Sequence, residues 1–217
     1  MSVDIEPAVT SAESVDQLVY LVDAARKTEL LAGLVSGRNL RQVLVFTRTK
    51  LQAGRLASQL NRYGVDAVAI HGDRTQPERE RALAGFKSGE VPVLVATDVA
   101  ARGLDIDGLP IVINYELPHT AHDYVHRIGR TGRAGATGQA ISLVAPDEEE
   151  YLRAVNRLLK HDLPVRVVKG FEPDLRASTR PREARSDRRS ARPASATRTP
   201  RRPGQTATRR GGGARVA

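Results

Sequence analysis

The chain has 217 residues, which suits one domain with additional segments, and 40% of them are hydrophobic, enough for a sizeable core. It contains no cysteine, so disulfides, thiolate metal sites and a cysteine nucleophile are excluded. No apolar run approaches the length that spans a bilayer, and the N-terminus lacks a signal-peptide layout, so we predict a soluble cytoplasmic protein without a membrane partner.

The formal net charge of +9 is carried by the C-terminal end of the chain. Residues 175–217 hold thirteen arginines, no lysine and two acids, whereas residues 1–174 are nearly neutral. The segment has almost nothing to bury, so we predict that residues 171–217 form a disordered Arg-rich tail. Such a tail attracts phosphate whatever the nucleic-acid sequence. We interpret it as a nonspecific RNA-binding arm, with a solvated spacer as the alternative.

The remaining chain alternates short apolar runs with helical patterns. Along the chain, the pattern predicts a lead-in strand and helix (14–35), a strand (42–46), a helix (50–64), a strand (65–70), a helix (75–89), strands (91–97 and 111–115), a helix (120–129), a strand (138–144) and a helix (146–160). Thr75, Pro77 and Gly89 are typical of an N-cap, a first turn and the position after a helix, and Gly64 is a plausible C-cap. Buried strands between helices predict βαβ units, an α/β fold and a parallel sheet.

Ligands of such sheets bind beyond the carboxyl ends of the strands. Residues 46–50, 71–79 and 96–107 fall there, and a fourth segment, 126–133, ends a helix. These segments supply threonine hydroxyls, helix N-termini and arginines, which are groups that bind phosphate. The sequence therefore predicts that this edge of the sheet binds a ligand with several phosphate groups. Each group also has a simpler reading, with threonines as helix caps, His71 as a turn residue, and Asp98 and Asp105 as caps or ion-pair partners.

Three motifs in this order resemble motifs IV, V and VI of DEAD-box RNA helicases: "VLVFTRTK", "ATDVAARGLDI" and "HRIGRTGRAG". The resemblance covers roughly residues 4–169, and residues 120–144 most resemble bacterial RhlE-like members. It implies an inter-lobe linker over residues 1–13 and a C-terminal RecA-like lobe over residues 14–170. The implied fold is a three-layer α/β sandwich with a mainly parallel sheet.

The resemblance also implies roles for matching residues. Arg130 and Arg133 resemble the catalytic pair that reaches the γ-phosphate of ATP, one of them as an arginine finger, and Asp105 resembles the carboxylate that holds the ATP ribose. His126 resembles the contact that couples this lobe to the other, and Arg102 is assigned to the same coupling. The residues that align with the grip on the RNA backbone are Thr47, Arg48, Gly72, Gln76, Arg79, Thr97 and Asp98.

The sequence departs from the family pattern in one large respect. It has no G-x-x-x-x-G-K-[ST] loop, no D-E-A-D run, no S-A-T segment and no adenine-reading Gln motif. These belong to the family's first lobe, so the resemblance implies half of a composite site. ATP and Mg²⁺ are then expected only in the complete two-lobe enzyme, with no metal site here. The chain alone, a monomer, is expected to hydrolyse no ATP and to unwind nothing.

Two other functions stay open. One is a stand-alone, non-enzymatic RNA-binding adaptor with a helicase-like fold. The other is a lobe of a DNA-acting relative, and the residues of the motif "HRIGRTGR" argue against it. If the chain is instead the C-terminal lobe of a helicase, the expected partners are RNA and an N-terminal RecA-like lobe.

Overall fold

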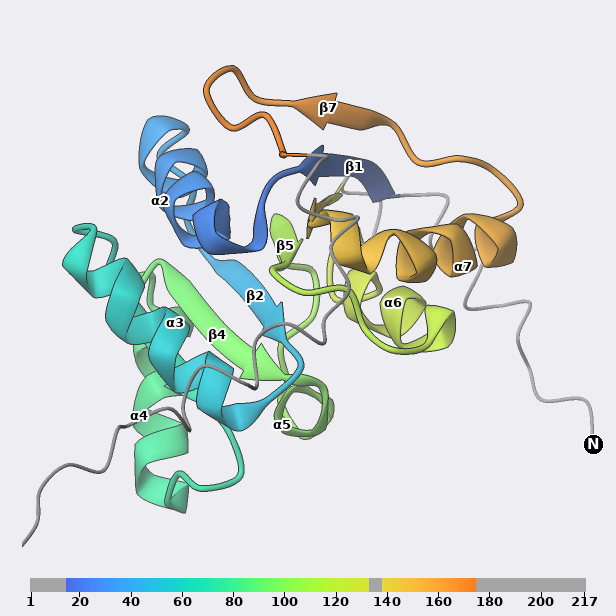
Figure 1. Ribbon diagram of the computed structural model, residues 1–217. Coiled ribbons are helices and arrows are strands. Elements are labelled where there is room, and N and C mark those ends of the chain that lie inside the picture. Colours follow the sequence, from blue (N-terminus) through green and yellow to red (C-terminus); the bar gives the residue numbers. More distant parts are fainter. Residues whose placement is uncertain (1–14, 133–137, 175–217) are drawn as a thin grey trace, which may run out of the picture. The chain divides into compact units, whose positions relative to one another are not determined.

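The computed structural model of the protein describes residues 15–132 and 138–174 (Figure 1). The predicted linker over residues 1–13, Arg133 and residues 175–217 of the predicted tail lie outside these ranges. Residues 171–174, at the start of the predicted tail, are described: Phe171 packs against the core of the domain, and the Arg26 guanidinium lies 4.2 Å from the centre of its ring. In the part of the chain that is described, no helix is long and apolar enough to cross a membrane.

A sheet of seven strands forms the centre of the domain, in the order β3-β4-β2-β5-β6-β1-β7. Every pairing between neighbouring strands is parallel. The mainly parallel sheet expected from the sequence is therefore parallel throughout. The strands are β1 (Val15–Leu21), β2 (Val43–Thr47), β3 (Ala67–Ile70), β4 (Val93–Thr97), β5 (Ile111–Asn114), β6 (Gly138–Val144) and β7 (Val165–Val167).

Helices connect the strands. They are α2 (Lys27–Gly37), α3 (Lys50–Arg62), α4 (Gln76–Lys87), α5 (Asp98–Arg102), α6 (Ala121–Ile128) and α7 (Glu149–Leu159). Two 3-10 turns, Ala24–Arg26 and Pro146–Glu148, precede α2 and α7. All of the predicted strands and helices are present, with ends shifted by a few residues. Two short elements, α5 and β7, were not predicted from the sequence.

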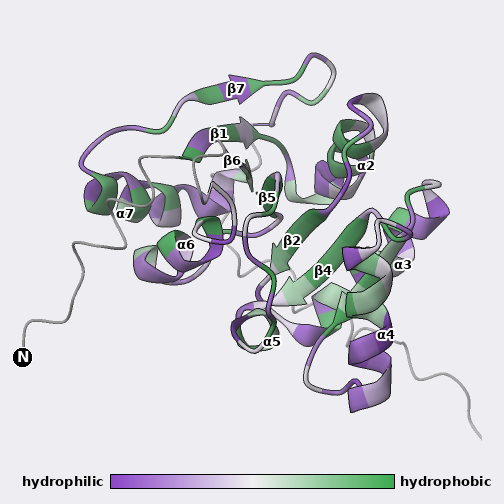
Figure 2. Cartoon of the chain, turned by 180° about the vertical axis from the view of Figure 1, so that it is seen from behind, coloured by the Kyte–Doolittle hydropathy of each residue, from purple (hydrophilic) through white to green (hydrophobic). Residues whose placement is uncertain are grey.

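The two faces of the sheet bury different sets of side chains, because successive residues of a strand point to opposite faces. In β2, Val43 and Val45 belong to the core cluster under α2 and α3. Leu44 and Phe46 belong to a second cluster with residues of α4 and α5. A third cluster joins β1 and β6 to α6 and α7. Figure 2 shows hydrophobic residues along the central strands and mixed colours on the helices. The domain therefore has three layers, as expected.

The local signals around α4 act as predicted. Thr75 is the N-cap, and the Glu78 carboxylate accepts hydrogen bonds from its backbone N–H and its hydroxyl, at 2.9 and 2.8 Å. Gly89 follows the helix with a φ of +79°, and Gly64 follows α3 with a φ of +76°. Both angles lie in the left-handed region that glycine adopts without a steric cost.

Candidate functional site

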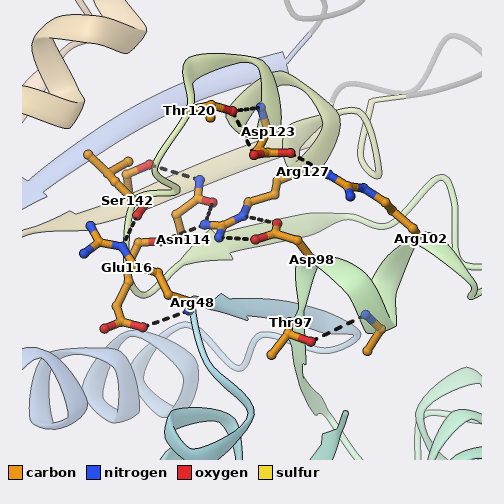
Figure 3. A network of polar contacts seen from close by, with 12 residues as sticks. Arg48, Thr97, Asp98, Arg102, Asn114, Glu116, Thr120, Asp123, Arg127 and Ser142 are labelled. Atoms are coloured by element: carbon orange, nitrogen blue, oxygen red, sulfur yellow. Dashed lines mark hydrogen bonds and ion pairs between the residues drawn. The ribbon is translucent and has the colours of Figure 1, made fainter. Parts of the chain in front are cut away.

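The segments predicted to bind phosphate meet at one edge of the sheet. Thr47 ends β2, Ile70 ends β3, Thr97 ends β4 and Asn114 ends β5. Because all of these strands run in the same direction, the loops that follow them lie at the carboxyl edge. Figure 3 shows the polar side chains that come together there.

The guanidinium group of Arg127 is the centre of this polar network (Figure 3). Its Nε and Nη2 atoms donate to the two carboxylate oxygens of Asp98, at 2.6 and 2.8 Å. Its Nη1 atom donates to the Asn114 side-chain oxygen at 3.0 Å and to the Glu116 carbonyl at 2.7 Å. The Arg127 side chain is only 1% exposed, and its guanidinium also lies 5.0 Å from the centre of the Phe46 ring. Arg127 therefore ties α6 to the ends of β4 and β5.

No role was predicted for Arg127 from the sequence. A signal for its burial was present, because Arg127 lies three residues after Tyr124 and next to Ile128, and both of these apolar-faced residues are buried on α6. A buried arginine needs acidic or carbonyl partners, and Asp98 directly follows a buried strand. The predicted RNA-binding residue Asp98 thus has its carboxylate engaged by Arg127, and a contact from it to RNA stays a prediction.

A second ion pair joins α5 to α6. The Arg102 Nη2 atom lies 2.5 Å from Asp123 Oδ1, and the other carboxylate oxygen of Asp123 accepts from the Thr120 hydroxyl at 2.8 Å. Thr120 caps α6 in turn, because its hydroxyl accepts from the Asp123 backbone N–H. The Arg102 side chain remains 59% exposed, so it is fixed at one end and accessible from outside.

Arg48 lies in a third group of charges that the sequence did not reveal. Its guanidinium donates to the Leu117 carbonyl at 2.6 Å and to Glu148 Oε1 at 3.0 Å. Lys27 also contacts the Glu148 carboxylate and donates to the Tyr115 carbonyl at 3.0 Å. Burial lowers the pKa of Lys27, since the charged form loses its hydration. Two N–H donors of the Arg48 guanidinium thus hold the residues before α3 in place, and its predicted RNA contact stays untested.

The threonines of the edge act mainly on neighbouring backbone. Thr47 is fully buried, and its hydroxyl donates to the Thr49 carbonyl at 3.3 Å. Thr49 caps α3 by accepting from the Gln52 N–H at 3.2 Å, and Thr97 caps α5 by accepting from the Ala100 N–H at 3.4 Å. The simpler interpretation of threonines as helix caps therefore describes Thr49 and Thr97, while the contacts of Thr47 and Thr97 to RNA remain predictions.

The loop after β3 and the start of α4 carry the other predicted RNA-binding residues. Gly72 is exposed, with no atom within 4 Å of the place where a Cβ would stand. The Gln76 amide donates to Glu80 at 2.8 Å. An Arg79 Nη2 atom lies 3.8 Å from the corresponding Cβ position of Gly103, so α4 meets the end of α5. The buried Arg79 Nε has no hydrogen-bond partner among the described residues. Arg79 therefore keeps one N–H donor without a partner among the described residues at this edge.

The end of α6 carries the predicted ATP-contacting residues. Arg130 Nη1 lies 3.0 Å from Asp107 Oδ1, and the Arg130 side chain is 22% exposed. Arg130 and the exposed His126 line one small depression together with Arg102 and Asp123. Asp105 is 96% exposed and pairs with Lys87 at 3.1 Å. The structure therefore brings Arg130, His126 and Arg102 together, and Arg133 lies outside the described residues.

Glycines shape the chain beyond α6. Gly132 has a φ of +69°, which side-chain-bearing residues rarely adopt. A Cβ at Gly138 would collide with the Thr131 hydroxyl and the Gly132 backbone. The Leu109 N–H donates to the Arg130 carbonyl at 3.0 Å, and the Thr131 hydroxyl donates to the Leu109 carbonyl. The loop after α5 and the segment after α6 are thereby held side by side.

The fold and its edge define a class: a parallel α/β domain whose carboxyl edge presents arginines on a fixed polar network. Residues 26–135 match the model of the helicase conserved C-terminal domain. The chain is 45% identical over 157 residues to the ATP-dependent RNA helicase RhlB of Pseudomonas syringae pv. tomato, a match covering 72% of this chain and 40% of that protein. It is 42% identical over 161 residues to the DEAD-box helicase CshA of Bacillus subtilis, covering 74% of this chain and 33% of CshA.

Solved structures agree with this match. The E. coli DEAD-box protein SrmB, bound to the regulator of ribonuclease activity A, superposes with a TM-score of 0.70 and 37% identity over 74% of this chain and 95% of that chain. S. cerevisiae Dbp5 bound to RNA and ADP BeF3 gives a TM-score of 0.64 and 33% identity, covering 71% of this chain and 41% of that chain.

The chain belongs to the helicase C-terminal domain family, in its DEAD-box branch, and has the RecA-like fold of that domain. The family expected from the three motifs is thus confirmed, and the bacterial relatives RhlB and CshA lie close to the RhlE-like expectation. The chain spans 40% or less of the length of these two relatives.

Proposed function

We propose that this domain is the C-terminal lobe of an ATP-dependent RNA helicase and supplies cations to an ATP molecule held by an N-terminal lobe. Arg130 and Arg133 act on the γ-phosphate, Asp105 holds the ribose, and His126 and Arg102 couple the two lobes. The observation that carries the proposal is the grouping of Arg130, His126 and Arg102 around one depression, on a frame fixed by buried Arg127. The family membership supports it.

The chemistry of phosphoryl transfer explains why such a frame is useful. Catalysis of this reaction comes mainly from positioning and from stabilising charge on the transferring group. Arg130 uses one of its nitrogen atoms on Asp107, which orients the guanidinium while leaving further N–H donors for a phosphate. A guanidinium keeps its charge at any physiological pH, so its contribution does not depend on a proton.

In the same proposal, RNA binds along the carboxyl edge through its phosphates. The unpartnered Nε of Arg79 and the exposed Gly72 next to the α4 N-terminus support this placement. The remaining members of the predicted RNA grip are Thr47, Arg48, Gln76, Thr97 and Asp98. Dbp5, with which this chain shares its fold, has been solved with RNA bound. SrmB has been solved with a protein regulator, so protein partners are also part of the proposal.

The chain by itself is proposed to be a monomer of the cytoplasm that has no ATPase activity, because its sequence contains no Walker loop and no D-E-A-D run. Within residues 15–132 and 138–174, no cluster of three or more His, Asp or Glu side chains could hold a metal ion. The Mg²⁺ ion of the complete enzyme is therefore assigned to the other lobe.

An RNA-binding adaptor is the second candidate function, and the thirteen arginines of residues 175–217 favour it. We expect the full chain to bind single-stranded RNA with an affinity that falls steeply with salt, since each neutralised phosphate releases counterions. Deleting residues 175–217 should weaken binding by about tenfold or more at physiological salt. Fluorescence anisotropy of labelled RNA measures this. An affinity unchanged by the deletion would contradict the assignment of these residues as an RNA-binding arm.

A further inference from the structure

A shallow groove of about 570 Å³ follows the outer surface of α3. We call it the α3 groove, and its main lining residues on the helix are Lys50, Leu51, Gly54, Arg55, Ser58 and Arg62. Leu51, Arg55, Ser58 and Arg62 recur at spacings of three and four residues, so they form one stripe along the helix. The stripe faces away from the core, because the buried residues of α3 are Ala53, Leu56, Ala57 and Leu60.

The charge of the α3 groove is mostly positive. Lys50 pairs with Asp73 across the groove at 2.8 Å, and both side chains are more than half exposed. The side chains of Arg55 and Arg62 are exposed and make no hydrogen bond or ion pair with any other described residue. Two guanidinium groups are therefore available for an anionic partner, while the single carboxylate is already neutralised.

The α3 groove is continuous with the carboxyl edge of the sheet. Lys50 begins α3 three residues after the end of β2, and His71 and Asp73 of the loop after β3 close one side of the groove. From there the helix runs back along the sheet to Arg62 (Figure 1). Twelve residue steps of an α-helix cover about 18 Å. A strand that leaves the edge at Lys50 can therefore follow the helix for several nucleotides.

We propose that the α3 groove binds single-stranded RNA that continues from the carboxyl edge. This inference rests on the proposed function and adds a binding surface to it. Phosphates would be met by Arg55 and Arg62. Bases would stack on arginine planes and on the ring of Tyr63, which follows Arg62 and is 56% exposed. The exposed Leu51 adds an apolar surface at the other end. This mixture of free arginines with an exposed aromatic ring favours RNA over an acidic peptide.

Gly54 offers a way to close the groove without weakening the helix. A Cβ built at Gly54 would lie 3.9 Å from His71 Nε2, which is an ordinary contact, so the backbone tolerates a side chain there. Glycine is among the poorest helix formers and leucine among the best, so Gly54→Leu fills the middle of the groove and favours α3 at the same time.

The test uses thiol labelling, because the chain contains no cysteine. Ser58→Cys introduces one thiol into the α3 groove of the full chain, and Ser88→Cys places a control thiol after α4, on the other face of the sheet. The rate of modification by a thiol reagent is measured with and without polyuridylate. Binding of the RNA is followed in the same samples by anisotropy.

We expect RNA that occupies about nine-tenths of the protein to slow labelling at position 58 by roughly tenfold, because only the unbound tenth stays reactive. The labelling rate at position 88 should not change. Adding Gly54→Leu, or Arg55→Ser with Arg62→Ser, should abolish the protection. RNA that binds without protecting position 58 would overturn this inference and leave the proposed function standing. Absence of RNA binding would overturn both. Equal protection by polyglutamate would replace RNA with an acidic peptide as the partner.

Discussion

Replacing Arg130 and Arg133 together by alanine, in this chain joined to the N-terminal lobe of a DEAD-box relative, is expected to slow RNA-stimulated ATP turnover by about 10³–10⁵-fold. The transferring phosphoryl group spreads its charge over three oxygens, and a guanidinium placed against them stabilises the transition state more than the ground state. The effect should fall on kcat, with little change in KM for ATP. Steady-state phosphate release measures both constants.

Single substitutions separate the two arginines. The residue that acts as the arginine finger should account for most of the loss, and the other for less. Arg157→Ala is the matched control, because Arg157 is an exposed arginine of α7 in a different surface hollow. It removes the same charge and should leave kcat within about twofold of the parent. A double variant that turns over ATP as fast as Arg157→Ala would refute the assignment of both residues to the γ-phosphate.

Arg127→Ala is expected to lower the free energy of unfolding of the domain by about 3–5 kcal/mol, the usual cost of breaking a buried ion pair from one side. The substitution leaves the Asp98 carboxylate, the Asn114 side-chain oxygen and the Glu116 carbonyl without their common donor. Urea unfolding followed by circular dichroism at neutral pH measures the change. Arg130→Ala, which removes a more exposed arginine three residues away, should cost less than about 1 kcal/mol.

Two further variants test the geometry of this pair. Arg127→Lys keeps the charge but cannot donate to Asp98 through two parallel N–H groups, so it should recover only part of the loss. A double-mutant cycle of Arg127→Ala with Asp98→Ala should show a coupling of at least about 1 kcal/mol. A loss below 1 kcal/mol for Arg127→Ala would mean that the network does not hold the edge together.

The sequence was sufficient for most of the fold. The alternation of apolar strands with helices predicted the parallel sheet, because the chain needs a crossover connection, usually a helix, to start a parallel strand. The two missed elements carry little pattern. The α5 helix has five residues, too few for the helical pattern to repeat, and β7 has three residues that are all exposed. β7 exists because its backbone pairs with β1, and a residue pattern does not report such a pairing.

The candidate site was predictable in place but not in its internal contacts. The positions of Thr47, Thr97 and the arginines relative to strand ends located the edge. Their partners are distant in sequence: Arg48 meets Glu148 one hundred residues on, and Arg127 meets Asp98 twenty-nine residues back. Only the folded chain shows that Arg48 and Arg127 donate to carboxylate and carbonyl oxygens of distant segments, while the Arg79 Nε has no partner among the described residues. Three arginines of similar appearance in the sequence thus have different surroundings.

In the proposed function, this domain completes an ATP site that another lobe begins. The most direct measurement is the RNA-stimulated ATPase rate of three samples: this chain alone, an N-terminal DEAD-box lobe alone, and the two joined in one polypeptide. We expect turnover only in the joined protein, with both separate lobes at background. Robust ATP hydrolysis by this chain alone, or a joined protein no faster than the N-terminal lobe, would contradict the proposed function.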